Sequence, residues 1–210
     1  MKPILLLFLL AGAAFAQTPS PFTKPLPLPG STGSFDDVRT GWHFTSGRWQ
    51  ANGLTQLDQN DTKETCSDAY KTIAQSGKTE YRLKEMYFKG QSACTTIYIM
   101  SDDGSKRERG NCYLIADSFD NKGKSEISIT KMVNDRGQGS KSFPVPGVSG
   151  QWIDLRITYD PATGELAIER DGRPIGSWVD PEPIKTGGDF SVGTCKSKAS
   201  FKDIVVRPST

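Results

Sequence analysis

The sequence is poor in the residues on which common catalytic and metal sites depend. It has one histidine, His43, and four cysteines, none of which lies in a Cys-x-x-Cys pair. A catalytic triad built on His43 would need a nucleophile and an orienting acid that no nearby motif indicates. A zinc site would have to draw on widely spaced thiols, so we expect structural disulfides instead. The sequence therefore predicts no cofactor and indicates no catalytic residue.

The sequence also lacks a strong net charge and a long second apolar run. Its 26 Lys and Arg residues face 24 Asp and Glu residues, for a net charge of +2. Nucleic-acid binding needs a clustered basic surface, so we expect no nucleic-acid partner. The apolar run Ile4–Leu10 is too short to cross the roughly 30 Å hydrocarbon core of a membrane, and no stretch of about 20 apolar residues follows it. We expect a monomer that does not span a membrane.

The amino terminus has the order of a secretory signal. A charged start, the apolar run and a small-residue ending at Ala14-Phe15-Ala16 predict a signal peptide over residues 1–16. Residues 17–33 are rich in proline and predict an extended spacer. Residues 34–210 would then form one domain. This organisation predicts a secreted or periplasmic protein.

Short runs with period two dominate the rest of the chain, and no ten-residue stretch has helical periodicity. The clearest is Trp152–Tyr159, followed by a turn at Asp160–Gly164 and by Glu165–Arg170, with a hairpin signal at Asp171-Gly172. About a dozen such strands predict an all-β fold, a two-sheet antiparallel β-sandwich. The other predicted strands are Arg48–Leu57 with a turn or bulge at Asn52-Gly53, Tyr81–Lys89 with a bulge that changes faces, Thr95–Met100, Cys112–Ala116, Ser125–Met132, Pro174–Val179, Phe190–Thr194 and Phe201–Val206.

Four cysteines allow three disulfide pairings. If Asp102-Asp103-Gly104 forms a three-residue hairpin loop, Cys94 faces Cys112 across the hairpin, and Cys66 pairs with Cys195. A long polar loop from Ser101 to Gly110 would break that register and the Cys94–Cys112 pairing with it.

Six short motifs together point to a known family: Gly41-Trp42, Gly47–Leu54, Gln151–Ile157, Thr163–Leu166, Asp171-Gly172-Arg173 and Ala199–Val206. They resemble concanavalin A-like, or laminin-G-like, jelly-roll domains, above all the exported bacterial set that includes 3-keto-glycoside hydrolases. The resemblance covers most of residues 35–207 and implies two curved antiparallel sheets, with a glycan bound on the concave face or the rim loops.

The chain departs from the enzymes of this fold. Their paired glutamates on one strand, with an aspartate between, have no counterpart, because no Glu-x-Asp-x-x-Glu or Glu-x-Asp-x-Glu string occurs. In the nearest string, Glu165–Asp171, the acids Glu165, Glu169 and Asp171 form a solvated side and Leu166 and Ile168 a core side. The resemblance to 3-keto-glycoside hydrolases also implies an Asn-Ser-Gly sequence before an arginine on a strand. This chain has Asn111-Cys112-Tyr113 at the comparable place.

Aromatic side chains on a sheet face are the natural partners of a sugar ring. Tyr87, Tyr98 and Tyr113 lie on three successive predicted strands, and Arg82 is close in sequence. We predict that these four residues form a shallow ligand-binding platform; the alternative is that the tyrosines are half-buried sheet residues without a ligand. A weaker alternative is a structural Ca²⁺ held by loop oxygens. Its candidate ligands are Asp102, Asp103, Asp117, Asp120 and Asn121.

These observations favour a non-catalytic domain that binds a polysaccharide or a cell-envelope glycan. The first alternative is a glycoside hydrolase whose carboxylate pair the motifs do not reveal. The second alternative is an envelope module for protein–protein interaction.

Overall fold

The computed structural model describes residues 37–63, 65–88, 93–106, 109–119 and 123–209. Within these ranges the chain forms fourteen strands and no helix. The predicted signal peptide and spacer lie outside the described residues and stay predictions. In the described part of the chain, no helix is long and apolar enough to cross a membrane.

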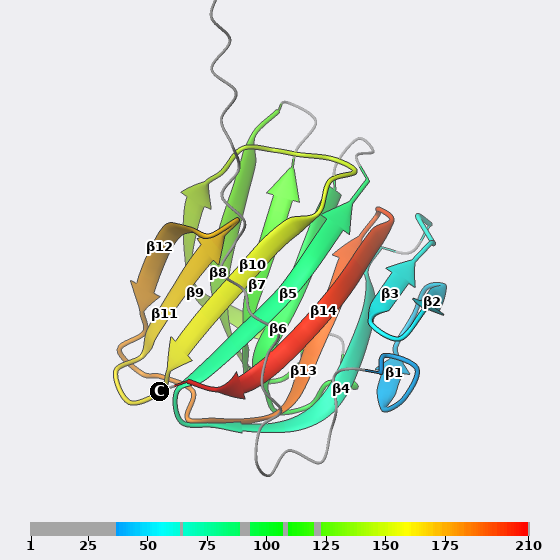
Figure 1. Ribbon diagram of the computed structural model, residues 1–210. Coiled ribbons are helices and arrows are strands. Elements are labelled where there is room, and N and C mark those ends of the chain that lie inside the picture. Colours follow the sequence, from blue (N-terminus) through cyan, green and yellow to red (C-terminus); the bar gives the residue numbers. More distant parts are fainter. Residues whose placement is uncertain (1–36, 64, 89–92, 107–108, 120–122, 210) are drawn as a thin grey trace, which may run out of the picture.

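The strands form two seven-stranded antiparallel sheets that stack face to face (Figure 1). These layers confirm the predicted β-sandwich. Sheet A contains, in spatial order, β1 (Trp42–Phe44), β4 (Ser67–Ser76), β13 (Thr186–Cys195), β6 (Ala93–Ser101), β7 (Cys112–Phe119), β8 (Ser125–Val133) and β9 (Arg136–Pro144). Sheet B contains β12 (Arg173–Val179), β11 (Glu165–Arg170), β10 (Ile153–Asp160), β5 (Thr79–Tyr87), β14 (Ala199–Pro208), β3 (Gln56–Gln59) and β2 (Trp49–Asn52).

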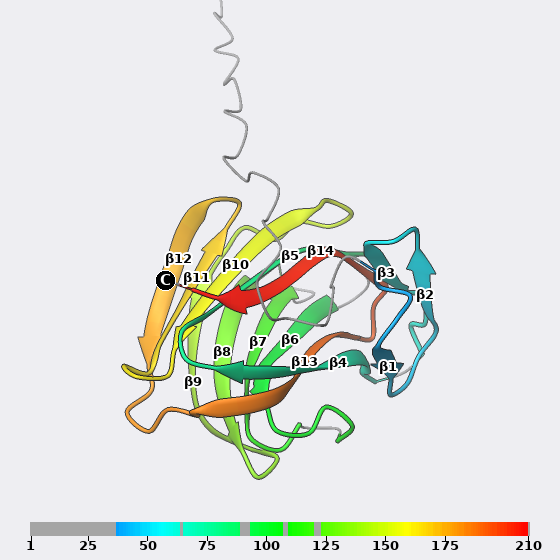
Figure 2. The same ribbon diagram turned by 60° about the horizontal axis from the view of Figure 1, so that its bottom comes forward.

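The core lies between the sheets and is filled by every second side chain of the long strands. Leu166 and Ile168 of β11 are buried there, as their alternation predicts. At the other side of the core, Phe190 packs against Trp42 and Tyr81, with ring centroids 6.3 and 6.0 Å apart. Burying one such side chain stabilises the fold by about 1.5–3 kcal/mol. Figure 2 shows the same two layers, with β1, β2 and β3 gathered at one side and β9 and β12 at the other.

The turns follow the predicted glycine and aspartate signals. Asp171 and Gly172 both have positive φ, 52° and 73°, as the two central residues of a tight hairpin require. Gly53 has φ 71° in the turn between β2 and β3. The predicted bulge in Tyr81–Lys89 is absent from the part that lies in β5, because burial alternates without interruption from Tyr81 to Tyr87. Lys89 lies outside the described residues. The register shift lies instead on its neighbour β14, between Lys202 and Val205.

The hairpin of β6 and β7 corrects the predicted cysteine pairing. Cys94 faces Ser118 rather than Cys112, because the connection after Ser101 is the longer of the two alternatives. Cys94 and Cys112 form no disulfide. Cys66 and Cys195 do, as predicted, and they close a loop with a sequence separation of 129 residues.

We expect the Cys66–Cys195 disulfide to contribute strongly to stability, because it removes conformational entropy from the unfolded chain over a long loop. Replacing both cysteines with alanine should lower the free energy of unfolding by about 2–5 kcal/mol. Urea unfolding of the variant and the parent protein measures this difference. Peptide mass spectrometry without reduction provides the control for the pairing, and a Cys94–Cys112 cross-link there would contradict the assignment.

Candidate functional site

The candidate site lies on the side of sheet A that faces away from the core. On β6 and β7, Ile97 and Ile115 face each other in the core. The next pair, Tyr98 and Leu114, lies on the opposite face with Met132 of β8, outside the main core. We call this side the outer face of sheet A.

The β6–β7 connection covers one half of the outer face. Arg109 is fully buried there: its guanidinium lies 5.0 Å from the centre of the Tyr98 ring and 3.1 Å from a carboxylate oxygen of Asp68. Gly104 packs so closely on Tyr70 that a Cβ atom would lie 2.5 Å from that ring. Its backbone amide also donates to Asp189, at 2.6 Å. This half of the face is therefore closed by the protein's own loop.

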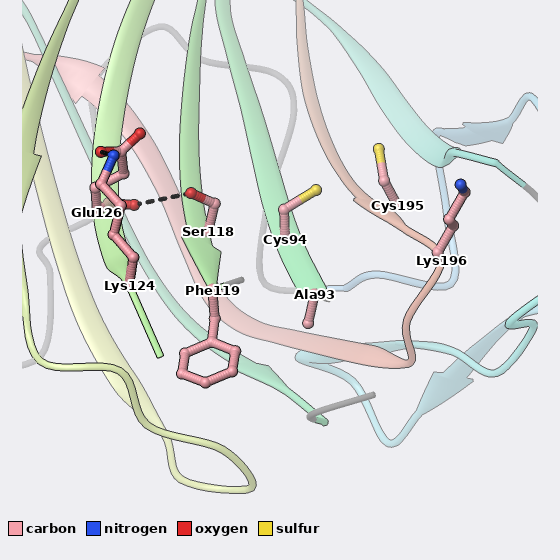
Figure 3. Close-up of a pocket in the computed structure, with 8 residues that line it drawn as sticks. All are labelled: Ala93, Cys94, Ser118, Phe119, Lys124, Glu126, Cys195 and Lys196. Atoms are coloured by element: carbon pink, nitrogen blue, oxygen red, sulfur yellow. Dashed lines mark hydrogen bonds and ion pairs between the residues drawn. The ribbon is translucent and has the colours of Figure 1, made fainter. Parts of the chain in front are cut away.

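The other half carries an open hollow of about 300 Å³. It lies where β6 and β8 begin and where β7 and β13 end. Cys94, Ser118, Glu126 and Cys195 contribute from these four strands (Figure 3). The rest of the described lining is Ala93, Phe119, Lys124 and Lys196.

The hollow combines several polar groups with Phe119 at its edge. The Phe119 ring is half-buried and packs against the core and Gly147, on the side of β7 opposite Ser118. The Ser118 hydroxyl donates to the backbone carbonyl of Glu126 at 3.3 Å, and the Lys124 ammonium lies 2.6 Å from the Glu126 carboxylate. Cys94 is partly exposed, and burial raises the pKa of its thiol, against the backbone amide of Cys195, which lowers it. These groups suit a small ligand rich in hydroxyls.

The structure does not bring the four predicted site residues together. Tyr87 and Tyr113 point into the core and are 1% and 0% exposed. The Tyr113 hydroxyl donates to Asp180 at 2.6 Å, deep between the sheets. Tyr98 is on the outer face but lies under Arg109. The predicted platform is therefore wrong as a single surface.

Arg82, the fourth predicted residue, lies on the outer side of sheet B. There it pairs with Glu80 at 2.7 Å, and Glu80 also binds Arg156 and Arg207 at 2.7 and 2.6 Å. Burial opposes ionisation of Glu80, but these guanidiniums hold its pKa below the ordinary value. Arg156 also pairs with Glu169, so the network ties β5, β10, β11 and β14 together.

Two carboxylates do approach each other, but inside the core. Glu85 of β5 and Asp117 of β7 are 0% and 2% exposed. Burial, followed by the nearby Asp117, raises the pKa of Glu85 well above its ordinary value. Burial raises the pKa of Asp117 to about 6, although the Arg170 guanidinium, 3.5 Å away, favours its charged form. No ligand can reach this pair without opening the sandwich.

The described candidate Ca²⁺ ligands make other contacts. Asp102 accepts hydrogen bonds from Asn111, Asp103 caps the turn at Ser105, and Asp117 lies in the core. Asp120 and Asn121 lie outside the described residues. Among the residues that are described, no three His, Cys, Asp or Glu side chains are grouped for a metal ion.

Sequence reasoning missed most of the hollow. Phe119, Lys124 and Lys196 lie at strand ends and turns, where period-two alternation carries little information, and Glu126 lies in a predicted strand. The pairings of β6 with β7 and β13, and of β7 with β8, bring these residues together.

No protein-family model matches the chain, and no curated protein sequence does. Solved structures do match in fold. The carbohydrate-binding module CBM66 from Bacillus subtilis has a TM-score of 0.64 and 18% identity, over 80% of this chain and 96% of that one. A legume lectin-like domain from Entamoeba histolytica has a TM-score of 0.62 and 12% identity, over 82% and 92% of the two chains. A β-glucanase from Bacillus licheniformis has a TM-score of 0.59 and 11% identity, over 84% and 96%.

These neighbours and the two stacked sheets define the class of the protein. It has the concanavalin A-like jelly-roll fold, as the resemblance in sequence implied. The finer resemblance to 3-keto-glycoside hydrolases stays a prediction.

The buried acid pair predicts a pH-dependent stability difference. Replacing Glu85 with glutamine keeps the shape of the side chain but removes its ionisation. In the unfolded parent chain Glu85 ionises near its ordinary pKa of 4.5, whereas the fold holds it protonated. The parent therefore loses stability as pH rises above that value, and Glu85→Gln lacks this contribution to the loss.

Urea unfolding between pH 4 and pH 8 measures the difference between the two proteins. The free energy of unfolding of Glu85→Gln, relative to that of the parent, should increase as pH rises. Glu165→Gln, at an exposed position on β11, is the matched control and should show no such growth. An advantage that is equal at all pH values would contradict the protonated state of Glu85.

The hollow also predicts which thiol reacts. Iodoacetamide should alkylate Cys94 in the folded protein but not Cys112, which is 0% exposed. Because the thiolate is the reactive form and burial raises the Cys94 pKa, the labelling rate should keep rising above pH 9. Peptide mass spectrometry after timed labelling measures both sites. Equal labelling of Cys112 in the folded state would contradict this arrangement.

Proposed function

We propose that this protein is an exported glycan-binding protein and that the hollow on sheet A is its binding site. The observation that carries the proposal is one open hollow that gathers the Ser118 hydroxyl and the Lys124–Glu126 pair. A sugar ring has an apolar face and a rim of hydroxyls that exchange hydrogen bonds with polar side chains. The hollow offers polar partners for the hydroxyls, and Ala93 and Phe119 are its apolar lining residues.

The size of the hollow suits a short stretch of a glycan. Its volume of about 300 Å³ is at the lower end of the roughly 300–1,000 Å³ range of small-molecule sites. The fold neighbours support the proposal, since one is named a carbohydrate-binding module, another a lectin-like domain and a third a glucanase.

The positions of the carboxylates in and near the hollow favour binding without hydrolysis. Retaining glycosidases need two carboxyl groups about 5–5.5 Å apart at the scissile bond. The described lining of the hollow holds one carboxylate, that of Glu126. The Glu85–Asp117 pair is buried away from it.

Export is the second part of the proposal. The signal-like residues 1–16 and the Pro-rich residues 17–33 suggest delivery to the periplasm or the exterior. The Cys66–Cys195 disulfide supports this, because such bonds persist in oxidising compartments. A polysaccharide or cell-envelope glycan is then the available ligand.

A glycan array with the full chain tests the function, and one substitution tests the site. Ser118→Trp fills the hollow with an indole ring. It should weaken binding to the glycan that the array retains best by about tenfold or more, because the sugar can no longer enter. Ser140→Trp, at an exposed edge position on β9, is the matched control and should leave affinity within about twofold. Calorimetry measures both affinities, and bound glycan should slow alkylation of Cys94.

Three results would contradict the proposal. The first is an array that retains no glycan. The second is an equal loss of affinity in Ser118→Trp and Ser140→Trp, which would place the site elsewhere. The third is release of reducing sugar by the full chain, which would favour a hydrolase.

A further inference from the structure

Lys196 is held at the rim of the hollow by a rigid turn. It directly follows β13 and has a positive φ of 54°, a backbone conformation that few residues other than glycine adopt. The neighbouring Thr194 and Ser197 are 1% and 2% exposed. The Thr194 hydroxyl donates to the carbonyl of Cys94 at 2.7 Å and lies 2.6 Å from the Ser197 hydroxyl. Buried hydroxyls on both sides therefore fix where the Lys196 side chain starts.

The charges of the hollow are unequal at its two ends. On the β8 side the Lys124 ammonium is paired with Glu126 at 2.6 Å. On the β13 side Lys196 is exposed and forms no ion pair within the described ranges (Figure 3). The described lining thus has two cationic side chains and one anionic side chain. The surplus positive charge belongs to Lys196.

We propose that the hollow selects acidic glycans. In this proposal the Lys196 ammonium forms an ion pair with the acid group of the bound sugar, a carboxylate or a sulfate. The inference rests on the proposed glycan-binding function. A ligand lying across the hollow from β8 to β13 meets a neutralised pair at one end and a single ammonium at the other. Only the second end offers an uncompensated charge, and a charge-assisted hydrogen bond there would add to the contacts that the ligand makes in the hollow.

The turn at Lys196 has a strained backbone. A glycine at position 196 would adopt the left-handed conformation without steric cost, whereas lysine keeps a strained backbone. Six other described residues besides glycines share this conformation, so the φ angle alone marks no site, and its role here is to fix the direction of Lys196. The buried pair of Thr194 and Ser197 holds the turn in place.

Lys198 provides a matched control within the same turn. It is exposed, it carries the same charge, and it does not line the hollow. A nonspecific attraction between a basic rim and an acidic polymer would depend on both lysines. Specific recognition would depend on Lys196 alone.

The experiment compares acidic and neutral polymers, two pairs of which share a backbone. The acidic probes are polygalacturonate, alginate, hyaluronan and dextran sulfate, and the neutral ones are methyl-esterified polygalacturonate and dextran. We expect the full chain to prefer an acidic probe, with an affinity that falls as salt rises. Lys196→Gln should weaken that binding by about tenfold, as expected for a lost charge-assisted hydrogen bond. Lys198→Gln should change it by less than about twofold.

The outcomes separate this inference from the function on which it rests. A preference for dextran sulfate or for a polyuronate, lost only in Lys196→Gln, supports the inference and identifies the anion. Equal losses in Lys196→Gln and Lys198→Gln would overturn it. Binding of neutral glycans as tight as that of acidic ones would also overturn it and leave glycan binding standing. Failure to bind any glycan, acidic or neutral, would remove the proposed function itself.

Discussion

The two sheets stabilise each other by burying one face each, and this constraint determines where a ligand can bind. Every second side chain of β5, β6, β7 and β10 is committed to the space between the sheets. Polar groups that fall in that register, such as Glu85 and Tyr113, are enclosed with the aliphatic core. Only the outer faces and the strand ends remain for recognition.

The outer face of sheet A is divided by the connection between β6 and β7. Arg109 fills the space between Asp68 and Tyr98, so half of the face is occupied by the chain itself. A buried ion pair is costly unless it is well packed, and here the guanidinium also covers an aromatic ring. The proposed ligand site therefore lies toward the far ends of the strands, at the hollow.

The hollow joins segments that are distant in sequence. Cys94, Ser118 and Glu126 come from three consecutive strands, whereas Cys195 and Lys196 come from the carboxyl-terminal part of the chain. The antiparallel pairing of β6 with β13 places Cys195 directly opposite Cys94, and the disulfide to Cys66 ties this corner to β4. The site is therefore built on a cross-linked corner of the sandwich, which limits the entropy lost when a ligand binds.

Much of the fold was readable from local patterns. Leu166 and Ile168 alternate with acids, and Asp171-Gly172 marks the turn that follows, so β11 and its hairpin are predictable. Strands β4 and β9 were not predicted. β4 buries Asp68, Lys71 and Gln75, and β9 is mostly exposed, so neither shows the usual hydrophobic alternation.

The sequence by itself determined the fold class, because alternation and turn residues act over a few neighbouring positions. It offered the Cys66–Cys195 pairing only as one of three possible arrangements, through a β6–β7 register that the structure does not have. The tertiary structure decided the β6–β7 register, the burial of Tyr87 and Tyr113, and the position of Lys196 beside Cys94. These depend on contacts between strands far apart in the chain, and the energies of such contacts leave no periodic trace in the sequence.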